Sequence, residues 1–161
     1  MSQTSYVEQG QLLAGQKADS GFDDVMSLLA EGAVPFGRFV TAGTDLDRQG
    51  QLPDAAADIT NVKAVRGIAI QSHAIESEYL GSNPAQYKDQ DAMSVMKKGR
   101  VAVNVEEAVT PADAVFVRYA GAGNAGEFRT DDPGSEAAEL ANARFITSTT
   151  GAGVAILEVD L

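Results

Sequence analysis

The sequence contains no cysteine and no tryptophan among its 161 residues. Without cysteine, the chain cannot form a disulfide, a thiolate metal site, an iron–sulfur cluster or a cysteine nucleophile. Basic side chains are also few, because 12 Lys and Arg residues stand against 23 Asp and Glu residues, for a formal charge of −11. This charge repels phosphate backbones and anionic lipid, so we expect neither nucleic acid nor a membrane among the partners.

Long apolar runs are missing as well. No segment approaches the roughly 18 consecutive apolar residues that suggest a membrane-spanning helix. The opening segment Met1–Gly10 has one acidic residue, no basic residue and no apolar centre of the kind found in signal peptides. We therefore expect the protein to stay in the compartment where it is made.

Glycine is abundant, with 16 residues, and short segments alternate apolar and polar side chains. This period of two predicts strands at 36–42, 62–71, 100–106, 114–120, 127–129, 144–149 and 153–161. Val101, Val103 and Val105 would share one face of a strand, as would Ala155, Leu157, Val159 and Leu161. Short strands joined by glycine-rich turns predict an all-β fold, either a small sandwich of the jelly-roll type or a barrel-like domain.

Local signals add short elements. Residues 25–29 follow Ser20 and Asp23, which could cap a short helix, but an irregular extended segment fits equally well. Lys97-Lys98-Gly99 predicts a tight hairpin turn, and residues 135–143 predict two turns of helix. Residues 50–58 are expected to be a loop, and 72–91 a connection long enough to be functional.

The first 17 residues are polar, with Gln3, Gln9, Gln11 and Gln16 and few bulky apolar groups. Such a segment buries little by itself, so we predict an extended N-terminal arm that becomes ordered against a partner. A frayed terminus is the alternative. Residues 18–161 are expected to form a single β-rich domain, since a chain of this size fits one core.

Two motifs suggest ligands but lack their structural context. Residues 121–126 match the glycine pattern of dinucleotide-binding loops, yet Asp131-Asp132-Pro133-Gly134 follows too soon for the helix that such a loop requires. Residues 45–50 begin like a calcium loop, but its twelfth position is Ala56 where a bidentate Glu is required. We interpret both as turns.

No catalytic constellation is evident. His73 is the only histidine, and no recognisable nucleophile motif accompanies it. Acidic residues could pair as in a glycosidase, but surface carboxylates are expected in a chain of this charge; the candidates were Glu76, Glu78, Glu106, Glu107, Asp131 and Asp132. We therefore predict a protein that is not an enzyme and that needs no cofactor and no metal.

An aromatic–arginine cluster is the best candidate for a binding surface. Phe36, Arg38 and Phe39 follow Pro35, and such residues are enriched at protein interfaces. In a strand Phe36 and Phe39 point to opposite faces, so one of them needs a partner outside the main core. That partner is either another protein or a loop of the same chain.

Six segments follow one another along the chain: 19–24 (DSGFDD), 33–40 (AVPFGRFV), 96–101 (MKKGRV), 106–109 (EEAV), 111–118 (PADAVFVR) and 154–161 (VAILEVDL). In this order they resemble the structural cement, or capsid decoration, proteins of tailed bacteriophages. The likeness extends over nearly the whole chain and includes an opening of the type Gln3-Thr4-Ser5-Tyr6.

This resemblance implies a virion protein that is made in the host cytoplasm and binds the outer surface of an assembled head. Its partner would be the major capsid protein, and it would reinforce the shell against internal DNA pressure. The resemblance also implies a homo-oligomer, for which we favour a trimer over a dimer. The predicted interface residues are Tyr6, Phe22, Phe36, Arg38 and Phe39.

Two other classes remain open. A carbohydrate-binding or carbohydrate-active β-sandwich would need an aromatic platform or a carboxylate pair in a cleft, and the absence of tryptophan counts against it. A tail or fibre component would share the β-rich composition, and purification with heads or with tails would distinguish the two.

Overall fold

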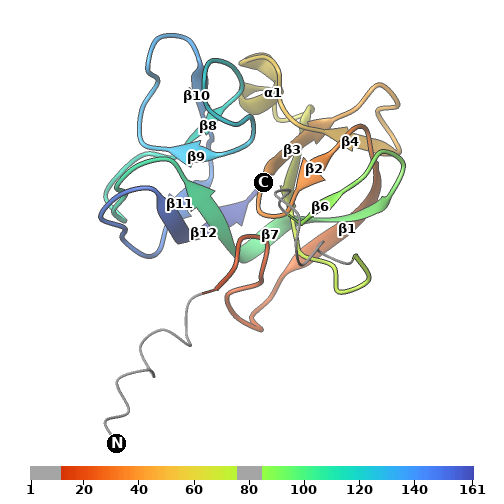
Figure 1. Ribbon diagram of the computed structural model, residues 1–161, viewed down its shortest axis with the longest axis horizontal. Helices are drawn as coiled ribbons and strands as arrows, with labels where there is room; N and C mark the ends of the chain where they lie inside the picture. The colour runs from red at the N-terminus through yellow and green to blue at the C-terminus, as the bar shows by residue number, and fades with distance from the viewer. Residues whose placement is uncertain (1–11, 76–84) are drawn as a thin grey trace, which may run out of the picture.

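The computed structural model describes residues 12–75 and 85–161, and Figure 1 shows them as strands and loops. Strand makes up 40% of the chain and helix 3%, which confirms the all-β class. Nothing helical in these two ranges has the length or the apolar character to cross a membrane. The elements are β1 (Asp24–Ala30), β2 (Val34–Pro35), β3 (Phe39–Ala42), β4 (Gln49–Gln51), α1 (Ala57–Thr60), β5 (Val65–Ala69), β6 (Gln86–Tyr87), β7 (Ala92–Val105), β8 (Phe116–Arg118), β9 (Phe128–Arg129), β10 (Ala137–Glu139), β11 (Ala143–Phe145) and β12 (Gly153–Asp160).

Strand β7 organises the molecule, since it is 14 residues long and runs through the middle of the view in Figure 1. Its first half pairs with β1 along one edge and with β5 along the other. Its second half pairs with β12, from Lys98↔Asp160 to Val105↔Gly153. The two halves of β7 therefore belong to two different packing units.

The first unit is a closed ring of strands. β1 pairs with β4, β4 with β3, β3 with β5, β5 with β7, and β7 pairs back with β1. Gly67 permits the close approach of β5 to β7, because a Cβ there would lie 2.1 Å from the carbonyl oxygen of Met96. The ring encloses its own hydrophobic core of buried side chains, which includes Leu28, Val34, Phe36, Val40, Tyr87, Met93 and Val95. The barrel-like alternative of the sequence prediction is the one observed.

The second unit contains the larger core, between β7, β12 and the strands β8 to β11. Val101, Val103 and Val105 of β7 are buried, as are Ala155, Leu157 and Val159 of β12. The alternation seen in the sequence predicted these two strands and their inward faces. Phe39, Phe128 and Phe145 complete the centre of this core.

The described part of the predicted arm lies against β7. The Gly15 N–H donates a 2.8 Å hydrogen bond to the carbonyl of Ala102, and Lys17 forms an antiparallel bridge with Val101. Residues 15–17 therefore pair along β7 within their own chain. The preceding residues of the arm, Tyr6 among them, lie outside the described residues.

Two predicted elements are wrong, and tertiary pairing explains both. The expected hairpin at Lys97–Gly99 does not occur, because β7 continues through it with partners on both edges; Gly99 instead adopts a φ of +134° within the strand. The expected helix at 135–143 is absent: residues 137–139 form strand β10, which pairs with β8, and residue 143 begins β11. Positive φ values at Ser135 and Asn142 bound this segment and are incompatible with a helix across it.

The remaining local predictions divide between the alternatives. Residues 25–29 form neither a helix nor an irregular segment, because they lie in β1 and pair with β7. The expected loop 50–58 begins within β4 and ends at α1. The glycine-rich stretch 121–126 connects the antiparallel strands β8 and β9, in agreement with its interpretation as a hairpin loop. Part of the long connection 72–91 lies outside the described residues.

Candidate partner-binding surface

The aromatic–arginine cluster differs from the expected exposed patch. Phe36, Arg38 and Phe39 are all buried, so the isolated chain does not present them on its surface. Phe22 is the opposite case, since its side chain is 84% exposed. Of the predicted interface residues in the described ranges, Phe22 is the one that a partner could contact directly.

Two separate cores explain why both phenylalanines are buried. Phe36 packs in the barrel core, edge-on to the ring of Tyr87 with the centroids 5.1 Å apart. Phe39 packs on the other side, in the larger core. The alternation argument correctly separated the two side chains, but the second partner is another part of the same chain.

Arg38 lies between the cores and is held by a carboxylate. Its Nη2 is 2.7 Å from Oε1 of Glu127, and Nη1 donates to the carbonyls of Asn124 and Ala125 at 3.4 Å. Burial lowers the pKa of the Arg38 guanidinium, and the negative charge of Glu127 acts in the opposite direction. This arginine therefore fixes the 121–126 loop against β3.

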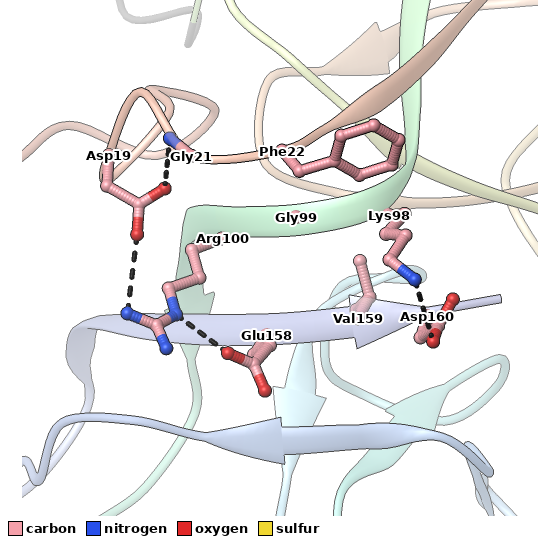
Figure 2. Close-up of a pocket in the computed structure, with 9 residues that line it drawn as sticks. All are labelled: Asp19, Gly21, Phe22, Lys98, Gly99, Arg100, Glu158, Val159 and Asp160. Atoms are coloured by element: carbon pink, nitrogen blue, oxygen red, sulfur yellow. Dashed lines mark hydrogen bonds and ion pairs between the residues drawn. The ribbon is translucent and has the colours of Figure 1, made fainter.

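A surface groove surrounds Phe22, where β7 passes from one unit to the other (Figure 2). Its volume is about 340 Å³. Gly99 has a φ of +134° at this point and lies next to Phe22 in the lining of the groove. The groove is lined by Asp19, Gly21, Phe22, Lys98, Gly99, Arg100, Glu158, Val159 and Asp160.

Ion pairs join residues that line this groove, as the dashed lines in Figure 2 show. Arg100 Nε donates to Glu158 at 2.7 Å, and its Nη1 lies 3.3 Å from Asp19. Lys98 reaches Asp160 at 3.2 Å. The hydrogen bond with Glu158 raises the pKa of Arg100, and the reciprocal bond lowers the pKa of Glu158. These paired charges hold the rim in place around an unpaired aromatic side chain.

A second charged cluster lies at β8 and β9, and sequence reasoning did not find it. Arg118 donates to both carboxylate oxygens of Glu106, at 2.6 and 2.8 Å, and to Glu136 at 2.7 Å. Arg129 lies 3.1 Å from Glu106 and 2.6 Å from Asp131. The hydrogen bond to Glu106 is the main cause that raises the pKa of Arg118.

This cluster accounts for several of the acidic residues that were considered for acid–base chemistry. Glu106 and Asp131 are bound by arginines, and the Glu107 carboxylate accepts from the backbone N–H of Thr130 at 2.9 Å. Glu76 and Glu78 lie outside the described residues. Arginines at strand positions, followed by acidic pairs, were the only signal for the cluster in the sequence.

The two ligand motifs form ordinary turns. The carboxylate of Asp45 accepts the backbone N–H of Asp47 at 3.1 Å, which stabilises the turn before β4. His73 is exposed. Within 12–75 and 85–161, no three His, Cys, Asp or Glu side chains gather in a way that would hold a metal ion.

Comparison with known proteins gives one family and one fold. A family model described as "Structural cement protein (E217 gp24/Pam3 gp6)" matches residues 2–160. A chain from a solved structure entitled "The capsid of Myoviridae Phage XM1" is similar, with a TM-score of 0.71 and 20% sequence identity. The likeness covers 94% of this chain and 91% of that one, and at this identity it establishes the fold alone. No curated protein matches.

Proposed function

The chain belongs to the structural cement protein family, and on that premise we propose that it binds the outer surface of a bacteriophage head and stabilises the shell. The match across residues 2–160 is the observation that carries this proposal. Family membership makes the chain a capsid-associated structural protein of the virion. Its place on the outside of the head and its partner, the major capsid protein, are our inference.

Binding stabilises a shell by mass action. A subunit that binds only the closed, expanded lattice lowers the free energy of that state and leaves other states unchanged. The shell then withstands a higher pressure from the packaged DNA before it opens. The acidic surface keeps unassembled subunits soluble and away from nucleic acid.

We propose that the Phe22 groove and the N-terminal arm make the contact with the head. Phe22 is 84% exposed and next to a hollow, so its apolar surface is available for burial against a partner. The arm is polar and has little to bury alone, so it gains contacts when it lies on the lattice. Phe36, Arg38 and Phe39 contribute indirectly, since they fix the structure behind this surface.

The test is co-sedimentation with heads that lack the decoration. We expect the full-length chain to sediment with heads and to raise the temperature at which they release DNA. A chain without Met1–Gly10 should bind less tightly and unfold at nearly the same temperature. Sedimentation with tails would favour the tail component, and binding to neither particle would refute the cement function.

A Phe22→Ala variant tests the groove. Burying a phenylalanine fully contributes about 1.5–3 kcal/mol, and most of it is still available here because Phe22 is 84% exposed. We expect binding to heads to weaken by about 8- to 70-fold, with little change in stability. Val62→Ala is the matched control, since Val62 is 80% exposed and lies outside the groove. Equal binding by the wild type and Phe22→Ala would exclude the groove from the contact.

We also propose a homo-oligomer, with a trimer favoured over a dimer, because a head lattice offers three-fold positions. The mass of one chain is 16.8 kDa. Light scattering on the purified protein should therefore give three times this mass, and a monomeric value would contradict the proposal.

A further inference from the structure

Strand β1 is paired along one edge and largely open along the other. Toward β7 it pairs from Asp24 to Leu29. Toward β4 the pairing is limited to its last two residues, Leu29 and Ala30. Among the described residues, no strand continues the sheet beside positions 25–27.

The direction of the backbone groups follows from the hydrogen bonds at the end of β1. Ala30 N–H donates at 2.9 Å to Asp91, on the β7 side, and Leu29 N–H donates at 2.7 Å to Arg48, on the β4 side. Backbone groups alternate along a strand. Val25 and Ser27 have the same parity as Leu29, so their N–H and C=O groups point away from β7 to the open edge.

The side chains at this edge are apolar and exposed. Val25 is 40% exposed and Leu29 is 37% exposed, while Ser27 between them is small and exposed. Phe22 precedes them on the same segment. Natural proteins usually protect a free strand edge with proline, lysine or a covering loop. Here, among the residues that the structure describes, the edge combines unpaired backbone groups with apolar side chains, which is the composition of a strand-addition site.

The charges around the edge define the partner. Asp24 stands at one end, and Asp45 and Asp47 lie in the turn that leads into β4 at the other end, where they outnumber the exposed Arg48. None of these three carboxylates forms an ion pair within the described part of the chain. A second copy of this chain would bring the same acidic groups to the contact, which like-charge repulsion disfavours. A strand that carries Lys or Arg at its ends is complementary.

We propose that the open edge of β1 accepts a short, basic, extended segment of the capsid subunit, which adds to the barrel as a further strand. This inference rests on the proposed function and names how the head is recognised. Because Gln49 of β4 already occupies the edge beside Leu29, the added strand pairs only with residues 24–27. Backbone hydrogen bonds would supply the affinity, and contacts with Val25 and Phe22 the register.

Proline substitution at the edge tests the proposal. Val25→Pro removes the outward N–H and leaves the β7 side of the ladder intact, and proline is tolerated on edge strands. Val25→Thr is the matched control, because it keeps the N–H and a β-branched side chain. Ser27→Pro repeats the test at the second outward position. We expect both proline variants to melt within about 4 °C of the wild type and to bind heads at least tenfold more weakly, whereas Val25→Thr binds normally.

Amide hydrogen exchange gives an independent measurement on the unmodified chain. The amides of Val25 and Ser27 should exchange rapidly in the free protein and slowly on decorated heads. Folded proline variants that bind like the wild type would overturn the strand addition while leaving the cement function standing. Unchanged exchange at both amides would overturn it even if the proline variants failed to fold. A wild-type dimer that Val25→Pro converts to monomers would assign the edge to a second copy, and absence of wild-type binding would remove both proposals.

Discussion

Replacing Glu106 by glutamine should be among the most damaging single changes to the stability of this fold. Glu106 accepts hydrogen bonds from Arg118 through both carboxylate oxygens, at 2.6 and 2.8 Å, and from Arg129 at 3.1 Å. Both arginines are buried. Glu106→Gln keeps the size of the side chain but leaves two buried guanidinium groups with one carboxylate fewer.

The expected loss of stability depends on the carboxylates that each arginine still contacts in the variant. Removing one partner of a buried ion pair costs about 3–5 kcal/mol. Arg118 retains Glu136 at 2.7 Å and Arg129 retains Asp131 at 2.6 Å, so we expect the lower end, about 3 kcal/mol. For a chain of this length, that loss lowers the midpoint of thermal unfolding by about 6–12 °C.

The assay is urea unfolding together with thermal unfolding, on the wild type, Glu106→Gln and Glu139→Gln. Glu139 is exposed on β10, so its substitution should change stability by no more than about 0.5 kcal/mol. If the stability of Glu106→Gln also changes by no more than about 0.5 kcal/mol, solvent replaces the lost carboxylate without cost. The argument that Glu106 stabilises two buried charges is then refuted.

Three further predictions concern the barrel and the acidic surface. Gly67→Ala should prevent β5 from closing the barrel, because its Cβ would lie 2.1 Å from the Met96 carbonyl oxygen at a φ of +139°; soluble, native-like protein would contradict this. Tyr87→Phe removes a hydroxyl that donates a buried 2.6 Å hydrogen bond, and urea unfolding should show a loss of about 1–3 kcal/mol. Backbone N–H groups, that of Glu136 foremost, lower the pKa of Asp132 from its ordinary 3.8. The stabilisation is therefore present above that value and lost as the pH falls through the folded pKa. When the free energy of unfolding is plotted against pH from 7 to 3, it should fall less steeply for Asp132→Asn than for the wild type.

Alternation in the sequence was a sound guide where a strand has one buried face in a single core. Val101, Val103 and Val105, and the matching residues of β12, were predicted to face inward and do so. The class of the fold followed from such segments and from the glycine-rich turns between them. Strand alternation and glycine-rich turns are local properties, so they can be recognised from a short stretch of sequence.

The errors come from pairing between distant segments. Lys97-Lys98-Gly99 has the composition of a tight turn, but β1 and β12 pair with this part of β7, so the strand continues through it. Residues 135–143 contain good helix formers, yet β8 pairs with residues 137–139 as a strand. Local propensity cannot report partners that arrive from elsewhere in the chain.

The candidate surface illustrates the same limit. Phe36 and Phe39 were correctly placed on opposite faces, but the sequence does not reveal that each face has its own core. Phe22 lies in one of the segments that carry the family resemblance, and nothing in the neighbouring sequence indicates that its ring is exposed. The open edge of β1 is visible only when the short reach of β4 is known.

The burial of three arginines affects the charge of the protein surface. Arg38, Arg118 and Arg129 are buried with carboxylates, so these 3 of the 12 basic residues contribute little to the outer surface. The carboxylates that they bind are partly buried beside them, and the exposed remainder of the chain stays strongly acidic. A protein that must reach a particle filled with DNA gains from such a surface, because it is repelled by free nucleic acid and attracted only where a partner presents basic groups. The buried ion pairs thus serve the fold, whereas Asp24, Asp45 and Asp47, which form no ion pair within the described residues, are the groups that we propose a basic partner would contact.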